Sequence, residues 1–333
     1  MSNSIPEIED ADLLFIFGYN GADSHPIVAR RIVRAKEKGA TLITVDPRVT
    51  ETARISDMHL PIKGGTNMIL VNAFGNVLIN ENLYDEEFIK EHTDNFEEYK
   101  KIVEPYTPEY AAKYTNIPAD MIRKTMREYA KAKDAMILYG MGVCQFSQAV
   151  DVVKGLASLA LLTGNFGRPN VGIGPVRGQN NVQGACDMGA LPDCYPGYQK
   201  VTNPEIRAKF EKAWGVKLPS KVGLKLTEVP HAFLEEHKIK AYYIFGEDPV
   251  QSDPDAAEVR EALDECEFVV VQDIFMNKTG LHADVIFPAT SWGEHDGVYS
   301  SADRGFQRIR KAVEPKGDVK TDWQIICEVS TAM

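Results

Sequence analysis

The stretch Leu13-Leu-Phe-Ile-Phe-Gly-Tyr-Asn-Gly-Ala-Asp-Ser24 decides the fold class of this chain. Its first five residues form an unbroken apolar run, which is typical of a strand buried on both faces of a parallel sheet. The residues that follow tolerate tight turns. Apolar residues at helical spacing then predict a helix over His25–Lys38, and Thr41–Val45 predicts a second strand. Together these elements predict a βαβ unit.

The same patterns continue along the chain and predict an α/β protein. Further strands are expected over Ala135–Tyr139, Tyr242–Phe245, Phe268–Asp273 and Ala283–Pro288, and further helices over Asn67–Ile79, Asp85–Glu91, Pro118–Lys133, Val150–Leu162 and Asp255–Leu263. Residues Pro169–Gly197 contain six glycines and little periodicity, so a long ordered loop is expected there. We predict two doubly wound, Rossmann-like αβα domains over residues 1–178 and 179–333.

Length and composition limit the class of protein. The chain has 333 residues, 44% hydrophobic and 26% charged, which indicates a globular protein and excludes disordered, collagen-like and coiled-coil classes. Apolar runs such as Leu156–Leu162 are far shorter than the roughly 20 residues of a membrane span, and no secretory signal is visible. The net charge of −11 opposes nucleic acid as a partner. No membrane span and a cytoplasmic location are therefore expected.

The five cysteines give no sign of a metal or disulfide framework. They are odd in number and widely spaced, and no Cys-x-x-Cys occurs. Free thiols in a reducing compartment are expected. An iron–sulfur cluster needs several clustered cysteines, so this chain alone has no means of holding one.

An internal similarity links the two predicted domains. Ile16-Phe-Gly18 recurs as Ile244-Phe-Gly246, and an aspartate ends the next strand in each half, Asp46 and Asp273. In an open α/β sheet these strand ends form the crevice where nucleotides bind. Neither half carries the Gly-x-Gly-x-x-Gly pattern of nicotinamide-dependent enzymes, which makes an ordinary nicotinamide-dependent dehydrogenase the least favoured interpretation.

The segment Pro175–Gly189 is rich in side-chain amides and holds one arginine, Arg177. Buried amides without partners cost about 1–3 kcal/mol each, so such a run needs solvent or a polar ligand. A guanidinium there suits a small carboxylate, which it holds at two points.

These motifs resemble the catalytic (alpha) subunit of molybdenum- or tungsten-dependent formate dehydrogenases, within the molybdopterin oxidoreductase superfamily. The resemblance runs along almost the whole chain and rests on Gly18-Tyr-Asn-Gly-Ala-Asp-Ser-His-Pro26, Asp46-Pro-Arg48, Tyr139-Gly-Met-Gly142, Pro175–Gly189, Gly246-Glu-Asp-Pro249, Gln272-Asp-Ile-Phe275, Thr290–Gly297, Ala302–Gln307 and Lys320–Trp323. It implies two related α/β domains, each binding one half of a bis-molybdopterin guanine dinucleotide that carries Mo or W. It also implies oxidation of formate to CO2, or the reverse.

The resemblance assigns residues to the cofactor and the substrate. The first dinucleotide would contact Asn20, Asp23, Ser24, Asp46, Arg48 and Gly65. The second would contact Met141, Gln145, Gln179, Gly246, Glu247, Gln251, Gln272, Asp273 and Asp322. Arg177 matches the arginine that orients formate, and no residue of this chain is expected to ligate the metal.

The chain departs from the family pattern in what it lacks. In the family, a cysteine or selenocysteine metal ligand, an adjacent histidine and the cysteines of a [4Fe-4S] cluster lie upstream of the segment that matches Met1, and a further domain follows. The expected partners are therefore these N- and C-terminal parts and an electron-accepting subunit, and the isolated chain is expected to be inactive. One hypothesis is a selenocysteine codon taken as a stop; a trimmed domain is the alternative.

Simpler interpretations remain open for individual residues. Arg177 is otherwise a loop arginine paired with Asp187, and Asp46 and Asp273 otherwise cap helices. His25 is interpreted as a helix-start residue and His295 as a structural histidine. For the whole chain, the alternatives are a non-catalytic scaffold of the same fold in an electron-transfer complex, and a related nitrate or polysulfide reductase.

Overall fold

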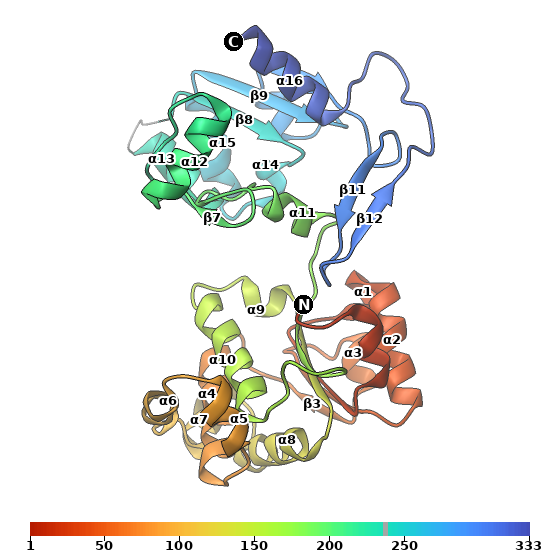
Figure 1. The fold of residues 1–333 in the computed structure, drawn as a ribbon, viewed down its shortest axis with the longest axis vertical. Helices are drawn as coiled ribbons and strands as arrows, with labels where there is room; N and C mark the ends of the chain where they lie inside the picture. Colours follow the sequence, from red (N-terminus) through yellow and green to blue (C-terminus); the bar gives the residue numbers. More distant parts are fainter. Residues whose placement is uncertain (236–238) are drawn as a thin grey trace. The chain divides into compact units, whose positions relative to one another are not determined.

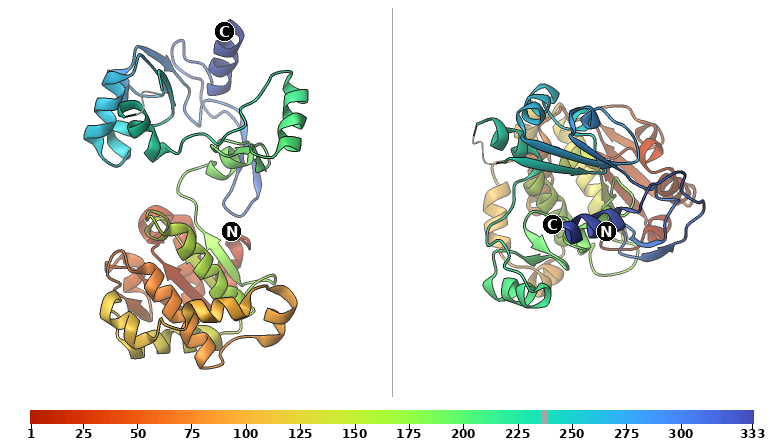
Figure 2. Two further views of the ribbon diagram at one scale, coloured as in Figure 1. Left: turned by 90° about the vertical axis from the view of Figure 1, so that its left-hand side faces the viewer. Right: turned by 90° about the horizontal axis from the view of Figure 1, so that it is seen from above.

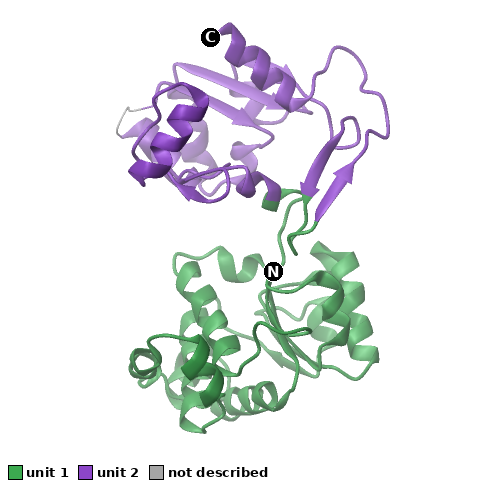
Figure 3. Cartoon of the chain, viewed as in Figure 1, with its two compact units in different colours: residues 1–183, 300–305 green, residues 184–299, 306–333 purple. Residues whose placement is uncertain are grey.

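The computed structural model describes residues 1–235 and 239–333. The chain divides into two compact units, one of residues 1–183 with 300–305 and one of residues 184–299 with 306–333 (Figure 3). The expected boundary lay between residues 178 and 179. The structure places the division after Gln183 and adds the short segment Ser300–Gly305 to the first unit, which sequence patterns did not indicate.

The first unit is built on a five-stranded parallel sheet in the order β3-β2-β1-β4-β5. Its strands are β1 (Leu13–Phe17), β2 (Thr41–Val45), β3 (Met58–Leu60), β4 (Ala135–Tyr139) and β5 (Gly172–Pro175). The register pairs Phe17 with Val45 on one side and with Tyr139 on the other. The carboxyl ends of β1, β2 and β4 therefore lie level at one edge of the sheet.

Alternate residues of β1 pack into two different hydrophobic cores, one on each face of the sheet, which explains its unbroken apolar sequence. Leu14 and Ile16 pack with Ile32 of α2 (Pro26–Glu37) on one face. Phe15 and Phe17 pack on the other face, where α4 (Asn67–Asn80), α8 (Ala119–Lys131) and α10 (Ala149–Leu162) lie (Figures 1 and 2). Each fully buried Phe contributes about 1.5–3 kcal/mol by removing apolar surface from water. The doubly wound arrangement predicted for this unit is confirmed.

The second unit contains a smaller parallel sheet in the order β10-β9-β8. Its strands are β8 (Ala241–Phe245), β9 (Phe268–Asp273) and β10 (Val285–Pro288). The core of this unit joins Ile244, Val269 and Val271 to Val259 and Leu263 of α15 (Ala256–Glu265). On the opposite face of the sheet, Tyr243, Phe245 and Phe268 remain exposed.

The remaining elements are short. In the first unit they are η1 (Ile5–Asp10), α1 (Gly21–Ser24), α3 (Glu51–Arg54), α5 (Glu86–His92), α6 (Phe96–Val103), α7 (Pro108–Thr115) and α9 (Met141–Cys144), while α11 (Val182–Asp187) crosses the division. The second unit adds β6 (Cys194–Tyr195), β7 (Gln199–Lys200), α12 (Pro204–Trp214), η2 (Leu226–Glu228), α13 (Val229–Leu234), α14 (Pro249–Ser252), η3 (Thr279–His282), β11 (Gly297–Ser300, whose last residue belongs to the first unit), β12 (Phe306–Ile309) and α16 (Asp322–Ala332). Within the described residues, no helix has the length and apolar character that a membrane crossing requires.

The expectation of a continuous loop over Pro169–Gly197 is wrong. The segment contains β5, α11 and β6. The sequence of β5, Gly-Ile-Gly-Pro, has poor intrinsic strand propensity, so local patterns miss it. Pairing with β4 forms the strand, and the backbone N–H of Ser2 donates to its Ile173 carbonyl at 2.9 Å.

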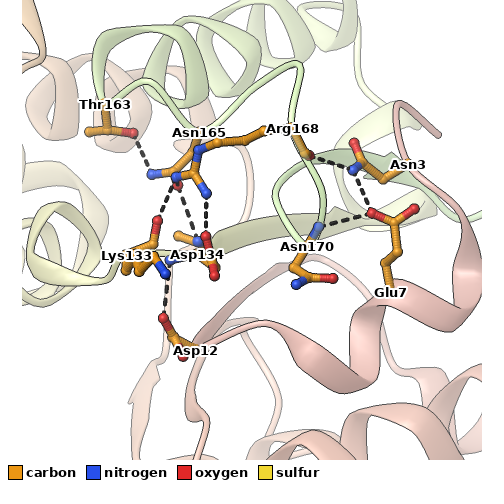
Figure 4. A network of polar contacts seen from close by, with 10 residues as sticks. Asn3, Glu7, Asp12, Lys133, Asp134, Thr163, Asn165, Arg168 and Asn170 are labelled. Atoms are coloured by element: carbon orange, nitrogen blue, oxygen red, sulfur yellow. Dashed lines mark hydrogen bonds and ion pairs between the residues drawn. The ribbon is translucent and has the colours of Figure 1, made fainter.

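A polar network holds the N-terminal segment beside the turn that precedes β5 (Figure 4). The Asn3 amide donates to Glu7 Oε2 and to the Arg168 carbonyl, each at 2.8 Å, and the Asn170 N–H donates to Glu7 Oε2 at 2.9 Å. Arg168 in turn pairs with Asp134. The hydrogen bond from Asn3, with those from Asn170 and Ser4, lowers the pKa of Glu7 from 4.5 to about 2 against the opposing effect of burial.

We expect Glu7→Gln to destabilise the first unit by about 1 kcal/mol near pH 7, a value discounted for solvent screening of this partly exposed carboxylate. Because the folded pKa is depressed, the stabilisation by Glu7 is present above pH 4.5 and is lost as pH falls toward 2. Urea unfolding should therefore show a difference in the free energy of unfolding between wild type and variant that disappears as the pH is lowered through this range. Glu87→Gln, at an exposed site on α5, is the control. A difference independent of pH would contradict the assignment.

Candidate functional site

A cavity of about 380 Å³ lies at the carboxyl ends of β1, β2 and β4 in the first unit. In strand order, β1 lies between β2 and β4, so the cavity lies where the chain connections reverse direction, the usual ligand position in such sheets. The lining residues come from the loops after these strands, from the starts of α2 and α4, and from the chain after β5: Phe17, Gly18, Tyr19, Asn20, Ser24, His25, Val45, Asp46, Pro47, Arg48, Ile62, Gly64, Asn67, Gly140, Met141, Gly142, Phe146, Val176 and Gly178.

Two glycines bring the backbones after β1 and β4 into direct contact at this cavity. The Gly142 N–H donates to the Gly18 carbonyl at 3.0 Å. A Cβ on Gly142 would lie 2.8 Å from the Gly18 Cα, and one on Gly18 would lie 2.7 Å from the Gly142 carbonyl carbon. Gly18 also has a φ of +56°, which disfavours other residues. The two loops can approach this closely only because both positions lack a side chain.

Asp46 lies at the end of β2 with a largely buried carboxylate. Its Oδ1 accepts the Arg48 N–H at 2.8 Å, which fixes the turn after the strand. Its Oδ2 has no hydrogen bond from the residues that the structure describes, and both Asp46 and Arg48 line the cavity. The site therefore offers one free carboxylate oxygen and one guanidinium to a ligand.

Asn20, which also lines the cavity, has its side-chain amide already engaged by the protein. The amide nitrogen donates to Asp23 at 2.6 Å and to Glu51 at 3.1 Å, and its oxygen accepts from the Thr52 hydroxyl at 2.9 Å. These bonds tie the loop after β1 to α3. The described contacts of Asn20 and Asp23 thus shape the loop, while Ser24 faces the cavity.

Two buried polar atoms beside this loop have no partner in the described part of the chain, the Tyr19 hydroxyl and His25 Nδ1. Both residues line the cavity, and their rings pack 5.5 Å apart. Burial raises the pKa of Tyr19, so its hydroxyl is a donor at all ordinary pH values. Because a buried donor or acceptor without a partner is costly, these atoms indicate a polar ligand or ordered water.

Arg177 follows β5 and is half-buried. Its Nη2 donates to Gln183 Oε1 at 3.1 Å, and its carbonyl oxygen lies 2.5 Å from His25 Nε2. Burial raises the pKa of Tyr139 to about 12 and also raises that of Cys144, while the positive charge of Arg177 opposes both shifts. The guanidinium therefore acts on the end of β4, beside the cavity, although its side chain does not line it.

The other first-unit residues expected at the cofactor are placed unevenly. Met141, assigned to the second dinucleotide, lines the same cavity as Asp46 and Arg48. Gly65, with a φ of +83°, is next to the lining residue Gly64. Gln145 and Gln179 are exposed and are not among the lining residues.

In the second unit, Gly246 and Asp273 end adjacent parallel strands, as the internal similarity predicts. The Gly246 N–H donates to the Gln272 carbonyl at 2.9 Å, and Gly246 has a φ of +64°. Asp273 accepts from the Phe275 N–H at 3.0 Å and from the Asn277 amide at 3.1 Å, so both of its oxygens are engaged in the turn after β9.

The polar groups near Gln272 are also paired internally. Gln272 is fully buried, its amide donates to Asp322 Oδ1 at 2.8 Å, and its oxygen accepts from the Tyr243 hydroxyl at 2.5 Å. These contacts hold the start of α16 against the sheet. Burial and then the charge of Asp253 raise the pKa of Glu247, whereas Gln251 is exposed.

Sequence reasoning missed several residues of the cavity. Tyr19 and His25 lie inside the recognised motif Gly18–Pro26 and line the cavity. Two polar aromatic rings beside a glycine turn were the sequence feature that could have indicated this. Asn67 and Phe146 carried no signal because they reach the cavity through tertiary packing. In the residues covered by the structure, no group of His, Cys, Asp and Glu side chains could hold a metal ion.

The family model described as molybdopterin oxidoreductase matches residues 1–332. This chain belongs to the molybdopterin oxidoreductase family. The family resemblance and the α/β fold class predicted from the motifs are thereby confirmed. The chain is 59% identical to formate dehydrogenase H of Escherichia coli over its full length, and 47% identical, over 98% of its length, to the F420-dependent formate dehydrogenase 1 subunit alpha of Methanococcus maripaludis.

The chain spans 47% and 48% of those two relatives, about half of their length. Among solved structures, acetylene hydratase from Pelobacter acetylenicus matches with a TM-score of 0.79 at 22% identity, covering 99% of this chain and 50% of that one. This similarity supports the fold assigned to the present chain. It does not indicate which reaction the chain takes part in.

We expect Gly142→Ala to destabilise the first unit by about 1–3 kcal/mol, because the added Cβ meets rigid backbone and the two loops must separate. Gly64→Ala is the matched control, since it lines the same cavity and its Cβ meets no atom within 4 Å. Thermal unfolding of both variants provides the measurement. Equal effects would show that the close contact of Gly18 and Gly142 is not a constraint.

Proposed function

We propose that this chain is the central part of a formate dehydrogenase catalytic subunit. It would bind a bis-molybdopterin guanine dinucleotide with Mo or W, and the complete protein would oxidise formate to CO2 or run the reverse reaction. Support comes from the formate dehydrogenases among its relatives and from family membership. The observation that carries the proposal is a cavity at the switch point of the first sheet, with Arg177 between the lining residues Val176 and Gly178.

The first cavity fits the nucleotide part of such a cofactor in size and chemistry. Its volume of about 380 Å³ lies within the usual range of small-molecule sites. The free Asp46 oxygen would accept hydrogen bonds from ribose hydroxyls or a guanine edge, and Arg48 would pair with phosphate. Asn20, Asp23 and Ser24 would form the loop that approaches the phosphates, with Gly65 opposite.

We propose a separate set of residues for the second dinucleotide. Gly246 and Asp273, at adjacent strand ends, are equivalent to Gly18 and Asp46. The full proposed set is Met141, Gln145, Gln179, Gly246, Glu247, Gln251, Gln272, Asp273 and Asp322. Since Gln272 and Asp322 already bond each other, their contribution would be to hold the start of α16 in place.

The cofactor, when bound, supplies the two-electron chemistry at its metal. The residues of this chain would bind and orient. Arg177 would pair with the formate carboxylate and fix the direction of its C–H bond, and the Gln183 contact would limit the rotation of the guanidinium. The electrons would leave through a [4Fe-4S] cluster in the longer subunit to an electron-accepting subunit, in the cytoplasm. The N- and C-terminal parts of the subunit would complete the site.

Arg177→Ala in the complete enzyme should lower kcat/KM for formate by tens- to hundreds-fold, because a charge-assisted contact contributes about 1.5–3 kcal/mol. Arg177→Lys keeps the charge and loses the two-point geometry, so it should recover only part of the loss. Steady-state formate oxidation with an artificial electron acceptor is the measurement. Unchanged formate kinetics in the alanine variant would remove Arg177 from the site.

Asp46→Asn should reduce pterin retention by the purified complete protein by about tenfold, because the variant keeps an oxygen for the Arg48 N–H and loses the charge offered to the ligand. Fluorescence of the oxidised pterin after release measures its content. Glu104→Ala, which changes an exposed carboxylate just after α6, is the control. Full retention in Asp46→Asn would argue against a nucleotide at this cavity, and absence of pterin from the wild type would favour the non-catalytic scaffold.

A further inference from the structure

We propose that His25 is a positioning residue for Arg177, acting through a hydrogen bond from its Nε2–H to the Arg177 carbonyl oxygen. The structural part of this inference stands on the contacts of this chain. Its consequence for catalysis rests on the proposed function, in which Arg177 holds formate.

The direction of this hydrogen bond is fixed by chemistry. The two atoms lie 2.5 Å apart, and a backbone carbonyl can only accept. His25 Nε2 therefore carries the proton, and in the neutral ring Nδ1 is the unprotonated atom. Nδ1 is buried without a partner in the residues described, so it offers no competing bond that would turn the ring away from Arg177.

The position of the His25 ring is determined by its surroundings. His25 is the residue between α1 and α2, and its backbone N–H donates to the Gly21 carbonyl at 2.9 Å. Pro26 restricts the backbone of the residue before it. His25 occupies the N-cap position of α2, in line with the helix-start position expected for it, but its side chain forms no cap hydrogen bond and its ring packs against Tyr19 at 5.5 Å. The imidazole is therefore a rigid donor held by the cavity wall.

The backbone of Arg177 lies beyond the last hydrogen bond to the sheet, so a donor from elsewhere is required to fix its position. The last bond to the sheet is from the Val176 N–H to the Tyr139 carbonyl at 3.0 Å. Beyond Arg177, the Gln179 carbonyl accepts only the nearby Val182 N–H, at 3.5 Å, and the next contact with a distant segment is at Asn181, whose side-chain oxygen accepts the Ser300 N–H at 2.9 Å. Between these two points, His25 bonds the peptide unit of Arg177 itself. The same histidine lines the cavity, so it links the proposed cofactor site to the arginine.

The first test measures how well this peptide unit is held and needs neither cofactor nor formate. Trypsin cleaves after arginine, so the rate of native-state cleavage between Arg177 and Gly178 reports opening at the bonded carbonyl. His25→Leu removes the donor and should raise this rate about fivefold, the factor expected for one ordinary hydrogen bond. His25→Gln places an amide N–H where Nε2–H stood and should keep the rate within about twofold of wild type.

Cleavage after Lys101 on α6, in the same digests, is the internal control and should not change. A His25→Leu rate at Arg177 equal to that of wild type would overturn the proposal. Equal rates for the Leu and Gln variants would also overturn it, because the hydrogen bond would then not be the cause. Acceleration at both sites together would mean general loosening of the unit and would reject a local role.

The second test addresses catalysis in the complete enzyme. His25→Leu should lower kcat/KM for formate, expressed per bound pterin, about fivefold, mainly through KM, with His25→Gln restoring the wild-type value. In an Arg177→Ala background, His25→Leu should cause no further loss, because no guanidinium remains to be positioned. An equal loss in both backgrounds would overturn the catalytic part. If the wild-type enzyme lacks formate turnover while the proteolysis result holds, the proposed function fails and the positioning of Arg177 by His25 stands.

Discussion

The first unit depends on the contact between two glycine backbones, where the chain after β1 meets the chain after β4. Gly142 donates to Gly18 across a gap that has no room for a Cβ at either position. Because this contact brings the two loops together, it sets the shape of the cavity beside them. Asp46 and Arg48 reach that space from the neighbouring strand, and the chain after β5 passes its other side. A change in this contact would therefore alter the walls that the chain forms after β1 and after β4.

The polar residues at the strand ends differ between the two units in how fully they are hydrogen-bonded within the protein. In the first unit, Asp46 retains a free oxygen, and the Tyr19 hydroxyl and His25 Nδ1 lack partners within the described residues. In the second unit, Asp273 and Gln272 are both bonded by neighbouring side chains or backbone. Unpaired buried polar atoms lower the stability of a protein. At the cavity of the first unit one carboxylate oxygen therefore remains free, whereas the corresponding groups of the second unit bond its own elements together.

Much of this organisation follows from local sequence. Strands β1, β2, β4 and β9 were predicted with their observed bounds, because runs such as Leu13–Phe17 have few alternatives to burial on both faces of a sheet. Strand β5 was missed because its Gly-Ile-Gly-Pro sequence becomes a strand only through pairing with β4. The glycines and aspartates at strand ends were found by spacing. The roles of His25, Tyr19 and Ser300 were not, because each depends on a contact between segments far apart in the chain.

The most direct measurement is an experimental structure of the complete protein purified with its cofactor and soaked with formate. We expect density for one guanine nucleotide in the first cavity, with a hydroxyl or ring N–H bonded to the Asp46 carboxylate and the Arg177 guanidinium turned toward formate. A first cavity filled only by water, with the nucleotides elsewhere, would contradict it. So would an Arg177 side chain directed away from the substrate.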